Sequence, residues 1–394
     1  MNIPKKFSKL VIAITTLMLF PLGIFAFSYY SVESQEFDNT LSDKTDTIYT
    51  NPIKIYVVQV TTDSEELSRD SATWVKALYY YSITRLYLSD IPYTYLLDES
   101  GIIYQGTEGG VGANPQLKEV DGAVTIGYLS NNTSLTNRAS DSLSEMIEEI
   151  SYNWGISDLS IVDLLINQEE GQLSTVSARE SSGDFANSVR EALVDWKGYE
   201  EENLEYKTRI EEIEYQEEIP IGERLEVRIK MRNMNDFIWF TDKDPIYVSV
   251  KDGEESEFAI NQEWDSFSKP VNISDKNILP GETVEVEFNL EARVFLGEAS
   301  ESFEILKFEG QPFENSGFEV KFNITKGDKQ LVEVNSVRYG FVNIRDCRWY
   351  SCEILDSADN GAIFILEGEE SGWSRIRFGI EQFGWVNSAY LKKI

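Results

Sequence analysis

The sequence predicts a multidomain protein in which one α/β domain precedes two all-β domains. Strand-like and helix-like segments alternate over residues 52–197. Short strands with period-2 alternation follow over residues 219–326, and short strands separated by glycines fill residues 333–394. The chain of 394 residues is also longer than one typical domain, which has roughly 100–200 residues.

The composition limits the partners that the protein can have. Hydrophobic residues make up 42% of the chain, which is enough to fill several cores. The formal net charge is −33 and the acidic residues are spread along the chain, so the protein repels phosphate backbones and we expect no nucleic-acid partner. The chain contains two cysteines and no histidine.

The pattern of the N-terminal segment is typical of a secretion signal. Three lysines lie within the first nine residues, an uncharged and mainly apolar run covers Leu10–Phe27, and polar residues follow. Residues 1–34 are therefore either a cleaved signal peptide or an N-terminal membrane anchor, and the sequence leaves both open. Residues 35–51 are polar and acidic, as expected of a linker, and the rest of the chain is expected to lie outside the cytoplasm.

The first domain, residues 52–197, contains the following predicted elements. Ile53–Thr61 and Ala123–Leu129 are β-branched runs typical of buried strands. A turn at Asp98–Gly101 separates two short apolar runs and indicates a hairpin. Helical spacing of apolar residues predicts three helices, over Ser71–Leu88, Leu143–Trp154 and Ala186–Trp196.

Part of this domain resembles a known family. The stretch Asp90–Gly106, DIPYTYLLDESGIIYQG, resembles the signature of type-2 N-acetylmuramoyl-L-alanine amidases and peptidoglycan recognition proteins. The strand Val57–Asp63 resembles the first core strand of that family, and Ala178–Leu193 resembles its closing segment. The resemblance implies an amidase-like mixed α/β domain with a cleft for peptidoglycan.

The residues expected to bind zinc depart from the family pattern. Family enzymes hold zinc with two histidines and a cysteine or aspartate, which then activates water. The first ligand position falls on Gln59 or Val60, the third falls near Ser181, and the second lies within Ile161–Glu170, which has no histidine. We therefore expect no zinc, assign no catalytic residue, and consider a site built from aspartates a poor replacement.

Tyr93 is the residue that still matches an active-site position of the family, and Tyr95 lies two residues further on. We predict that both contact ligand if the cleft still binds glycan or stem peptide. The alternative is that the cleft is only a structural remnant.

The middle of the chain is predicted to be a β-sandwich. Residues 198–218 are rich in glutamate and are interpreted as an acidic, partly helical linker. Leu225–Asn233 alternates apolar and charged residues, and three later segments do the same between turn signals. The pieces around Trp239 and Pro280–Val284 resemble extracellular immunoglobulin-like (Ig-like) modules, so residues 219–326 are expected to be an Ig-like β-sandwich.

The C-terminal segment, residues 333–394, resembles the bacterial SH3 (SH3b) family over its whole length. The matching pieces are Val342–Arg345, Gly361, Gly372–Trp373, Gly384–Val386 and Tyr390–Leu391. The resemblance implies a small SH3-like barrel, whose relatives commonly bind cell-wall peptidoglycan, especially its peptide. We predict ligand contacts from Trp349, Tyr350 and Trp373, although Trp373 also fits a place in the core.

The two cysteines, Cys347 and Cys352, flank Arg348–Ser351 in the first long loop of this segment. In an oxidising compartment such a pair closes a small disulfide loop. Zinc is a poor alternative because the chain has no further cysteine or histidine to complete four ligands.

These observations predict an extracytoplasmic protein that binds peptidoglycan or its stem peptides through a non-catalytic amidase-like domain or the SH3b barrel. A divergent amidase and a surface adhesin or scaffold that uses the Ig-like domain are the alternatives.

Overall fold

The computed structural model describes residues 32–33, 48–114, 122–167, 175–242, 244–274, 276–292, 296–307, 310, 312–379 and 382–394. The chain forms two compact units, Met1–Leu204 and Glu205–Ile394. The predicted signal or anchor, residues 1–34, lies almost entirely outside the described residues. None of the helices in the described part of the chain is both long enough and apolar enough to cross a membrane.

The first unit is built on a seven-stranded sheet with the order β1-β5-β4-β7-β3-β8-β9. Strands β4, β7, β3 and β8 run parallel to one another, whereas β5 and β9 are antiparallel to their neighbours β4 and β8. A separate two-residue ladder joins β2 to β6. The strands are β1 (Val32–Glu33), β2 (Ile48–Tyr49), β3 (Lys54–Val60), β4 (Tyr95–Asp98), β5 (Ile103–Gln105), β6 (Ala113–Asn114), β7 (Ala123–Leu129), β8 (Leu159–Asn167) and β9 (Thr175–Glu180).

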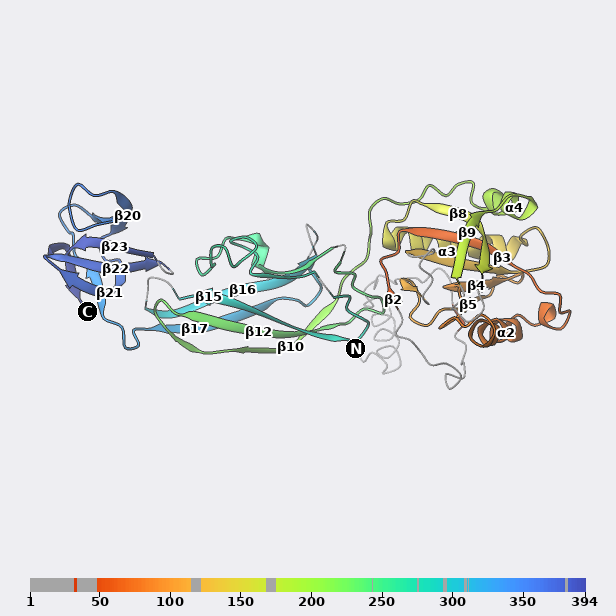
Figure 1. Ribbon diagram of the computed structural model, residues 1–394, viewed down its shortest axis with the longest axis horizontal. Helices are drawn as coiled ribbons and strands as arrows, with labels where there is room; N and C mark the ends of the chain where they lie inside the picture. Colours follow the sequence, from red (N-terminus) through yellow and green to blue (C-terminus); the bar gives the residue numbers. More distant parts are fainter. Residues whose placement is uncertain are drawn as a thin grey trace, which may run out of the picture. The chain divides into compact units, whose positions relative to one another are not determined.

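Helices cover both faces of this sheet (Figure 1). Successive residues of a strand point to opposite faces. Leu129 of β7 belongs to the core that contains Trp74 of α2, whereas the neighbouring Tyr128 stacks on Phe185 of α4. The helices are α2 (Ser71–Thr84), α3 (Asn137–Trp154) and α4 (Asp184–Ala192), and a short 3-10 helix, η2 (Leu67–Arg69), precedes α2. The predicted strands and helices of this region are confirmed, with helix ends shifted by up to six residues. Strands β8 and β9 were not assigned from the sequence.

Local sequence explains where these elements begin and turn. Asp70 accepts a hydrogen bond from the Thr73 amide at the start of α2, and Thr136 does the same for Ala139 at the start of α3. The β4–β5 hairpin requires glycine at position 101, which has a φ of +84°. A Cβ atom there would also lie 2.9 Å from the carbonyl oxygen of Arg138.

The second unit begins with two sheets that share one core. One sheet has the order β10-β12-β15 and the other has the order β11-β17-β16-β13-β14. In β12, every second side chain is buried and enters the core around the fully buried Trp239 and Phe303, which is the predicted period-2 pattern. The strands are β10 (Thr208–Tyr215), β11 (Glu218–Pro220), β12 (Arg224–Asn233), β13 (Ile246–Val250), β14 (Val271–Ile273), β15 (Thr283–Glu291), β16 (Gly297–Lys307) and β17 (Phe318–Thr325), with a 3-10 turn η4 (Lys251–Gly253).

The interpretation of residues 198–218 as a partly helical linker is wrong for its second half. Thr208–Tyr215 is strand β10, which pairs antiparallel with β12 along its length. Ile210 and Ile213 pack against the shared core while glutamates face solvent. The high glutamate content led to the linker interpretation, although charged residues are also common on the exposed side of an edge strand.

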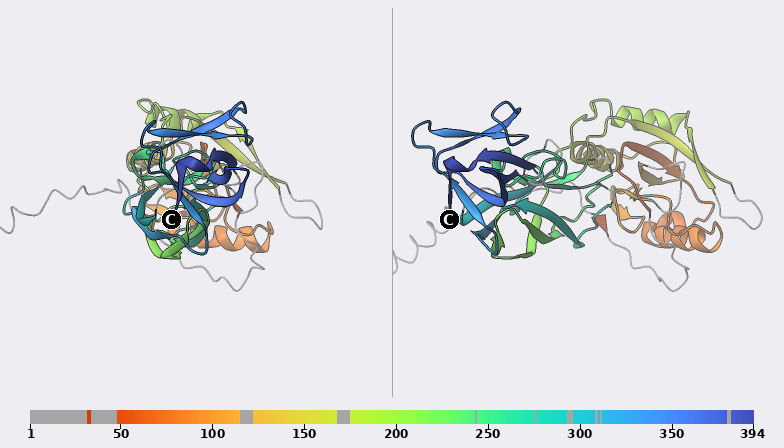
Figure 2. Two further views of the ribbon diagram at one scale, coloured as in Figure 1. Left: turned by 90° about the vertical axis from the view of Figure 1, so that its left-hand side faces the viewer. Right: turned by 60° about the vertical axis from the view of Figure 1, so that its left-hand side comes forward.

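The C-terminal domain is a seven-stranded sheet with the order β20-β19-β23-β22-β21-β18-β24. Its small core includes Val342, Ile344, Ile376 and Val386. Figure 2 shows the strands of this domain in blue. The elements are β18 (Leu331–Val334), β19 (Phe341–Arg345), β20 (Ile354–Asp359), β21 (Ile363–Glu370), β22 (Trp373–Gly379), β23 (Gln382–Asn387), η5 (Ser388–Tyr390) and β24 (Leu391–Lys393). The assignment of the two all-β parts as Ig-like and SH3-like remains a prediction from the sequence.

Candidate functional site

The first candidate site lies at the carboxyl end of strand β3 in the N-terminal sheet. Gln59 lies near the end of β3, and its amide nitrogen donates hydrogen bonds to the carbonyl oxygens of Ser130 at 3.1 Å and Asn132 at 2.8 Å. Asn131 and Thr62 exchange a second pair of hydrogen bonds across the same gap. A primary amide has two N–H donors, so Gln59 uses both of them to hold the β3 and β7 ends together.

Ser181 directly follows β9, which is separated from β3 by β8 in the same sheet. Its amide donates to the carbonyl of Ile161 at 2.8 Å, and Ile161 pairs with Val57 of β3, two residues before Gln59. Strand β8 thus lies between the strand that carries Gln59 and the segment that carries Ser181, and their match to the family's ligand positions stays a prediction. The stretch Ile161–Glu170 forms most of β8, and its last residues lie outside the described part of the chain.

These residues do not fit the zinc that the resemblance implies. Transition-metal sites prefer imidazole and thiolate ligands, whereas a primary amide and a hydroxyl are weak ligands. Both donors of the Gln59 amide are engaged with backbone carbonyls, and the chain has no histidine to supply instead.

Tyr93 lies in the hydrophobic core beside β4 and is 9% exposed. Burial raises the pKa of Tyr93 to about 12. Tyr95 is half-buried in β4 opposite Gln105. Little of the Tyr93 surface is open to a ligand in this structure, and the predicted binding role of both tyrosines stays a prediction.

The second candidate site is a groove of about 240 Å³ on the C-terminal domain. It lies where β19 meets the end of β23, and its floor includes the buried side chains of Val342, Val386 and Trp373. The lining residues are Ser336, Tyr339, Phe341, Val342, Asn343, Arg345, Tyr350, Trp373, Val386, Asn387 and Tyr390. Tyr339, Phe341 and Tyr350 are among the exposed large side chains of the protein.

Tyr350 is held in place although it is 66% exposed. The side-chain amide of Asn387 donates to the Tyr350 hydroxyl at 2.6 Å, and the Tyr350 ring packs edge-to-face on Trp373 with ring centres 5.2 Å apart. Edge-to-face contact is a favoured geometry of aromatic pairs. One wall of the groove is thus a fixed aromatic ring with an open face.

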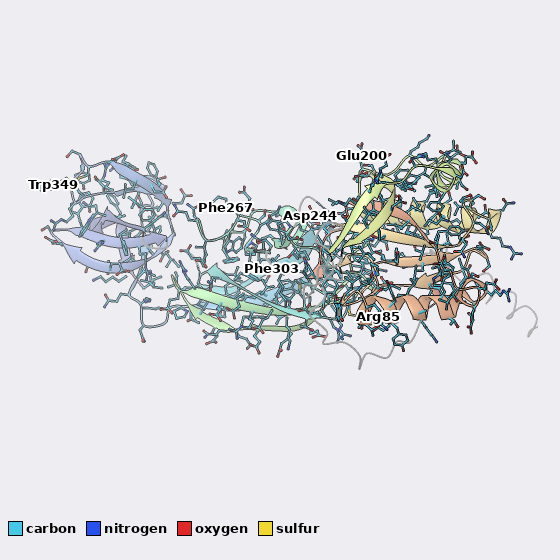
Figure 3. All side chains as sticks on the ribbon, turned by 45° about the vertical axis from the view of Figure 1, so that its right-hand side comes forward. Arg85, Glu200, Asp244, Phe267, Phe303 and Trp349 are labelled. Atoms are coloured by element: carbon cyan, nitrogen blue, oxygen red, sulfur yellow. A yellow bond between two sulfur atoms is a disulfide. The ribbon has the colours of Figure 1, made fainter. Side chains whose placement is uncertain are left out.

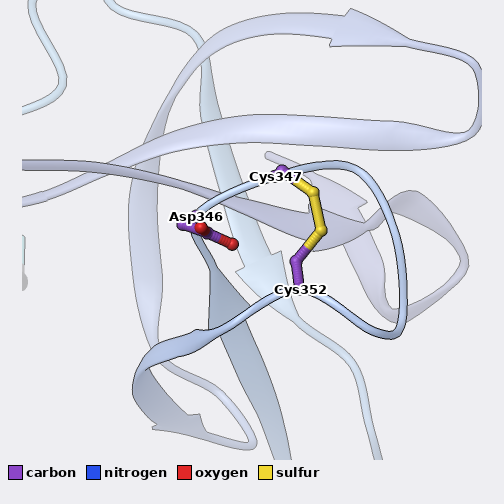
Figure 4. Close-up of side chains that lie close together, drawn as sticks. All are labelled: Asp346, Cys347 and Cys352. Carbon is purple, nitrogen blue, oxygen red and sulfur yellow. A yellow bond between two sulfur atoms is a disulfide. The ribbon is translucent and has the colours of Figure 1, made fainter.

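The loop that carries Tyr350 is closed by the predicted disulfide between Cys347 and Cys352 (Figure 4). The Arg345 guanidinium donates to the carbonyl oxygen of Cys352 at 2.7 Å and ties the end of the loop to β19. The Asp346 carboxylate lies close to both sulfur atoms, but sulfur atoms joined to each other are not thiolate ligands for a metal.

The groove brings together two of the three C-terminal residues that the sequence predicted. Tyr350 and Trp373 line it, whereas Trp349 does not line it and lies on the loop at the outer surface, 72% exposed (Figure 3). Sequence reasoning missed Tyr339, Phe341, Arg345, Asn387 and Tyr390. The alternation of β19 was the available signal, because its even-numbered residues Val342 and Ile344 are buried and its odd-numbered residues face outward.

Comparison with known proteins gives structural neighbours only. No family model matches the chain, and no curated protein matches it. The chain is similar to PGRP-Hd from Alvinella pompejana, with 17% identity, a TM-score of 0.30, and coverage of 43% of this chain and 97% of that one. It is similar to Drosophila peptidoglycan recognition protein SA, with 14% identity, a TM-score of 0.30, and coverage of 44% and 96%.

A third neighbour is an endolysin, the N-acetylmuramoyl-L-alanine amidase LysCS from Clostridium intestinale. It shares 16% identity at a TM-score of 0.24, with coverage of 33% of this chain and 80% of that one. Similarities of this size do not assign the chain to a family.

Proposed function

We propose that this protein binds peptidoglycan outside the cytoplasm through the groove of its C-terminal domain. The observation that carries the proposal is the groove itself, with exposed aromatic rings around an apolar floor and Tyr350 fixed above it. Rigid aromatic rings supply large contact areas at a low cost in conformational entropy. The resemblance of residues 333–394 to bacterial SH3 domains supports peptidoglycan, and its peptide in particular, as the ligand.

We further propose that the N-terminal unit does not hydrolyse peptidoglycan. Hydrolysis in the amidase family depends on a metal-activated water. In this chain the positions that match the ligands hold Gln59 and Ser181, and the Gln59 amide is bonded to two backbone carbonyls.

The proposed location outside the cytoplasm rests on two features. The predicted signal in residues 1–34 directs export, and the Cys347–Cys352 disulfide is of a kind that persists in oxidising compartments.

Co-sedimentation with insoluble peptidoglycan tests the proposal. The purified full chain is mixed with peptidoglycan or with chitin, which offers a related glycan without peptides, and the pellet and supernatant are analysed together. We expect protein in the peptidoglycan pellet, little in the chitin pellet, and no released fragments. Protein that stays in the supernatant would refute the binding proposal.

Released fragments would instead support the alternative of a divergent amidase. Metal analysis of the same preparation separates the two functions, because a zinc hydrolase should carry about one zinc per chain. We expect far less than one, and fragment release that stops on addition of a chelator would overturn the non-catalytic assignment.

A further inference from the structure

Within the described part of the chain, the residues that line the groove carry no negative charge, whereas the chain as a whole is strongly acidic. The protein has 68 acidic and 35 basic residues. Among the described residues that line the groove, none is acidic, and Arg345 is the one side chain that carries a full charge at neutral pH. The described lining therefore offers one cationic group and no acidic one, which favours an anionic group in the groove.

Arg345 is placed to act as that cationic partner. It is half-buried at the end of β19, and Asn343 lies two residues earlier, on the same side of the strand. One of the five N–H donors of the guanidinium goes to the Cys352 carbonyl, which fixes the side chain. In the part of the chain that the structure describes, no carboxylate forms an ion pair with Arg345.

A half-buried guanidinium without a carboxylate partner has lost part of its hydration. A ligand carboxylate would replace that hydration with charge-assisted hydrogen bonds, and the planar fork of arginine matches the two oxygens of a carboxylate. The neighbouring aromatic rings would then pack against small apolar groups beside the carboxylate.

We infer that the groove recognises a free carboxylate of a peptide, with Arg345 as the carboxylate-binding side chain and Asn343 as a second polar contact. This inference rests on the proposed function and deepens it, because it names the chemical group by which the peptide is held. Glycan hydroxyls alone would not satisfy Arg345 in this way, so the peptide and not the sugar chain is the specific ligand.

The test compares two forms of one synthetic ligand. A peptidoglycan stem pentapeptide with all carboxylates free is titrated into the full chain by calorimetry, and so is the same peptide with every carboxylate amidated. We expect the free acid to bind at least about tenfold tighter, because a hydrogen bond to a charged group contributes about that much affinity. The preference should shrink as salt concentration rises.

Variants assign the effect to Arg345. Arg345→Gln should abolish the preference for the acid, and Arg345→Lys should keep part of it, because lysine preserves the charge without the fork. Arg375→Gln is the matched control, since Arg375 is exposed on β22, stacks on Phe383 and does not line the groove. Thermal unfolding of each variant shows whether the domain is intact.

The outcomes separate this inference from the proposed function. Equal binding of acid and amide, together with retention of insoluble peptidoglycan, would overturn the inference and leave the proposed function standing. Loss of binding to both peptides and to insoluble peptidoglycan would refute both. Displacement of the peptide by glycerol phosphate at equal or lower concentration would show a phosphate polymer to be the preferred ligand and would also overturn the inference.

Discussion

Two regions of this protein are candidate ligand sites, and they differ in how their polar groups are used. At the edge of the N-terminal sheet, the Gln59 amide and the Asn131 side chain are engaged with the backbone of neighbouring strands and loops. In the C-terminal groove, the hydrogen bonds of Asn387 and Arg345 serve to hold a loop, and the ring face of Tyr350 stays exposed.

The difference shows that a resemblance in sequence does not by itself locate a binding site. A polar group that is satisfied within the protein gains little from a ligand, because the new hydrogen bond only replaces an existing one. An exposed aromatic surface gains from every ligand atom that removes it from water. The groove is thus the stronger candidate, and binding should depend on its residues and not on those of the N-terminal sheet.

The largest effect is expected from Tyr350→Ala. The change removes one wall of the groove, and truncation of a central aromatic contact commonly costs about 2 kcal/mol or more, or about 30-fold in affinity. The variant should fold normally because Tyr350 is 66% exposed. Peptidoglycan binding is measured by co-sedimentation at several protein concentrations.

Tyr81→Ala is the control for this experiment. Tyr81 is a similarly exposed tyrosine, 55% exposed, on α2 of the N-terminal unit. Its removal should leave binding unchanged. A loss of binding on Tyr81→Ala that equals the loss on Tyr350→Ala would show that the groove has no special role.

The second effect concerns the disulfide. Replacing Cys347 and Cys352 by serine opens the loop that carries Tyr350, and we expect binding to fall about tenfold. Closure of so short a loop contributes about 2 kcal/mol to stability in the chain-entropy model, and the midpoint of thermal unfolding should fall accordingly. If the disulfide acts by positioning Tyr350, its loss should have little further effect on binding in the Tyr350→Ala background. Additive losses would contradict that role.

Much of the fold followed from the sequence, because the relevant patterns are local. The run Ala123–Leu129 is β7 with the predicted ends, and Asp98–Gly101 is the predicted turn. Strand β10 was missed because its glutamates are set by exposure to solvent at a sheet edge and resemble those of a linker.

Fewer residues of the candidate site than of the fold could be predicted from the sequence. The disulfide and two groove residues, Tyr350 and Trp373, were predicted from residue type and family likeness. The roles of Arg345 and Asn387 depend on contacts with Cys352 and Tyr350, which are made only after the loop has folded against β19 and β23. Residue type alone did not distinguish these two side chains from surface residues.

A third, smaller effect tests Tyr93 through alkaline pH. Burial raises the pKa of Tyr93 to about 12, whereas an unfolded tyrosine has a pKa of about 10. Between these values the unfolded chain loses the phenolic proton and the folded chain keeps it. The free energy of unfolding should therefore fall as pH rises from about 10 to about 12, by about 1 kcal/mol at pH 11 for this residue.

Tyr93→Phe should remove this part of the pH dependence and leave peptidoglycan binding at neutral pH unchanged. Urea unfolding at pH 9 and pH 11, followed by the helical circular dichroism signal of α2, α3 and α4, measures the free energy of unfolding at each pH. The exposed Tyr81 gives the control Tyr81→Phe. A loss of peptidoglycan binding on Tyr93→Phe would instead place Tyr93 in a working cleft and reverse the contrast between the two regions.

The last effect, on stability and not on binding, is expected at Gln59. Gln59→Ala leaves the carbonyls of Ser130 and Asn132 without their side-chain donor, which should cost about 1 kcal/mol in stability. Water can replace the amide at the exposed Asn132, but less readily at Ser130, which is buried. Gln59→Glu should cost more at neutral pH, since a carboxylate has a similar shape but no donor and would face two carbonyl oxygens. Urea unfolding of both variants measures the order. If Gln59 serves to hold β3 against the end of β7, stability will decrease in the order wild type, Gln59→Ala, Gln59→Glu, and peptidoglycan binding will be equal in all three. A Gln59→Glu variant as stable as the wild type would mean that this end of the sheet is open to solvent and able to accept new ligands.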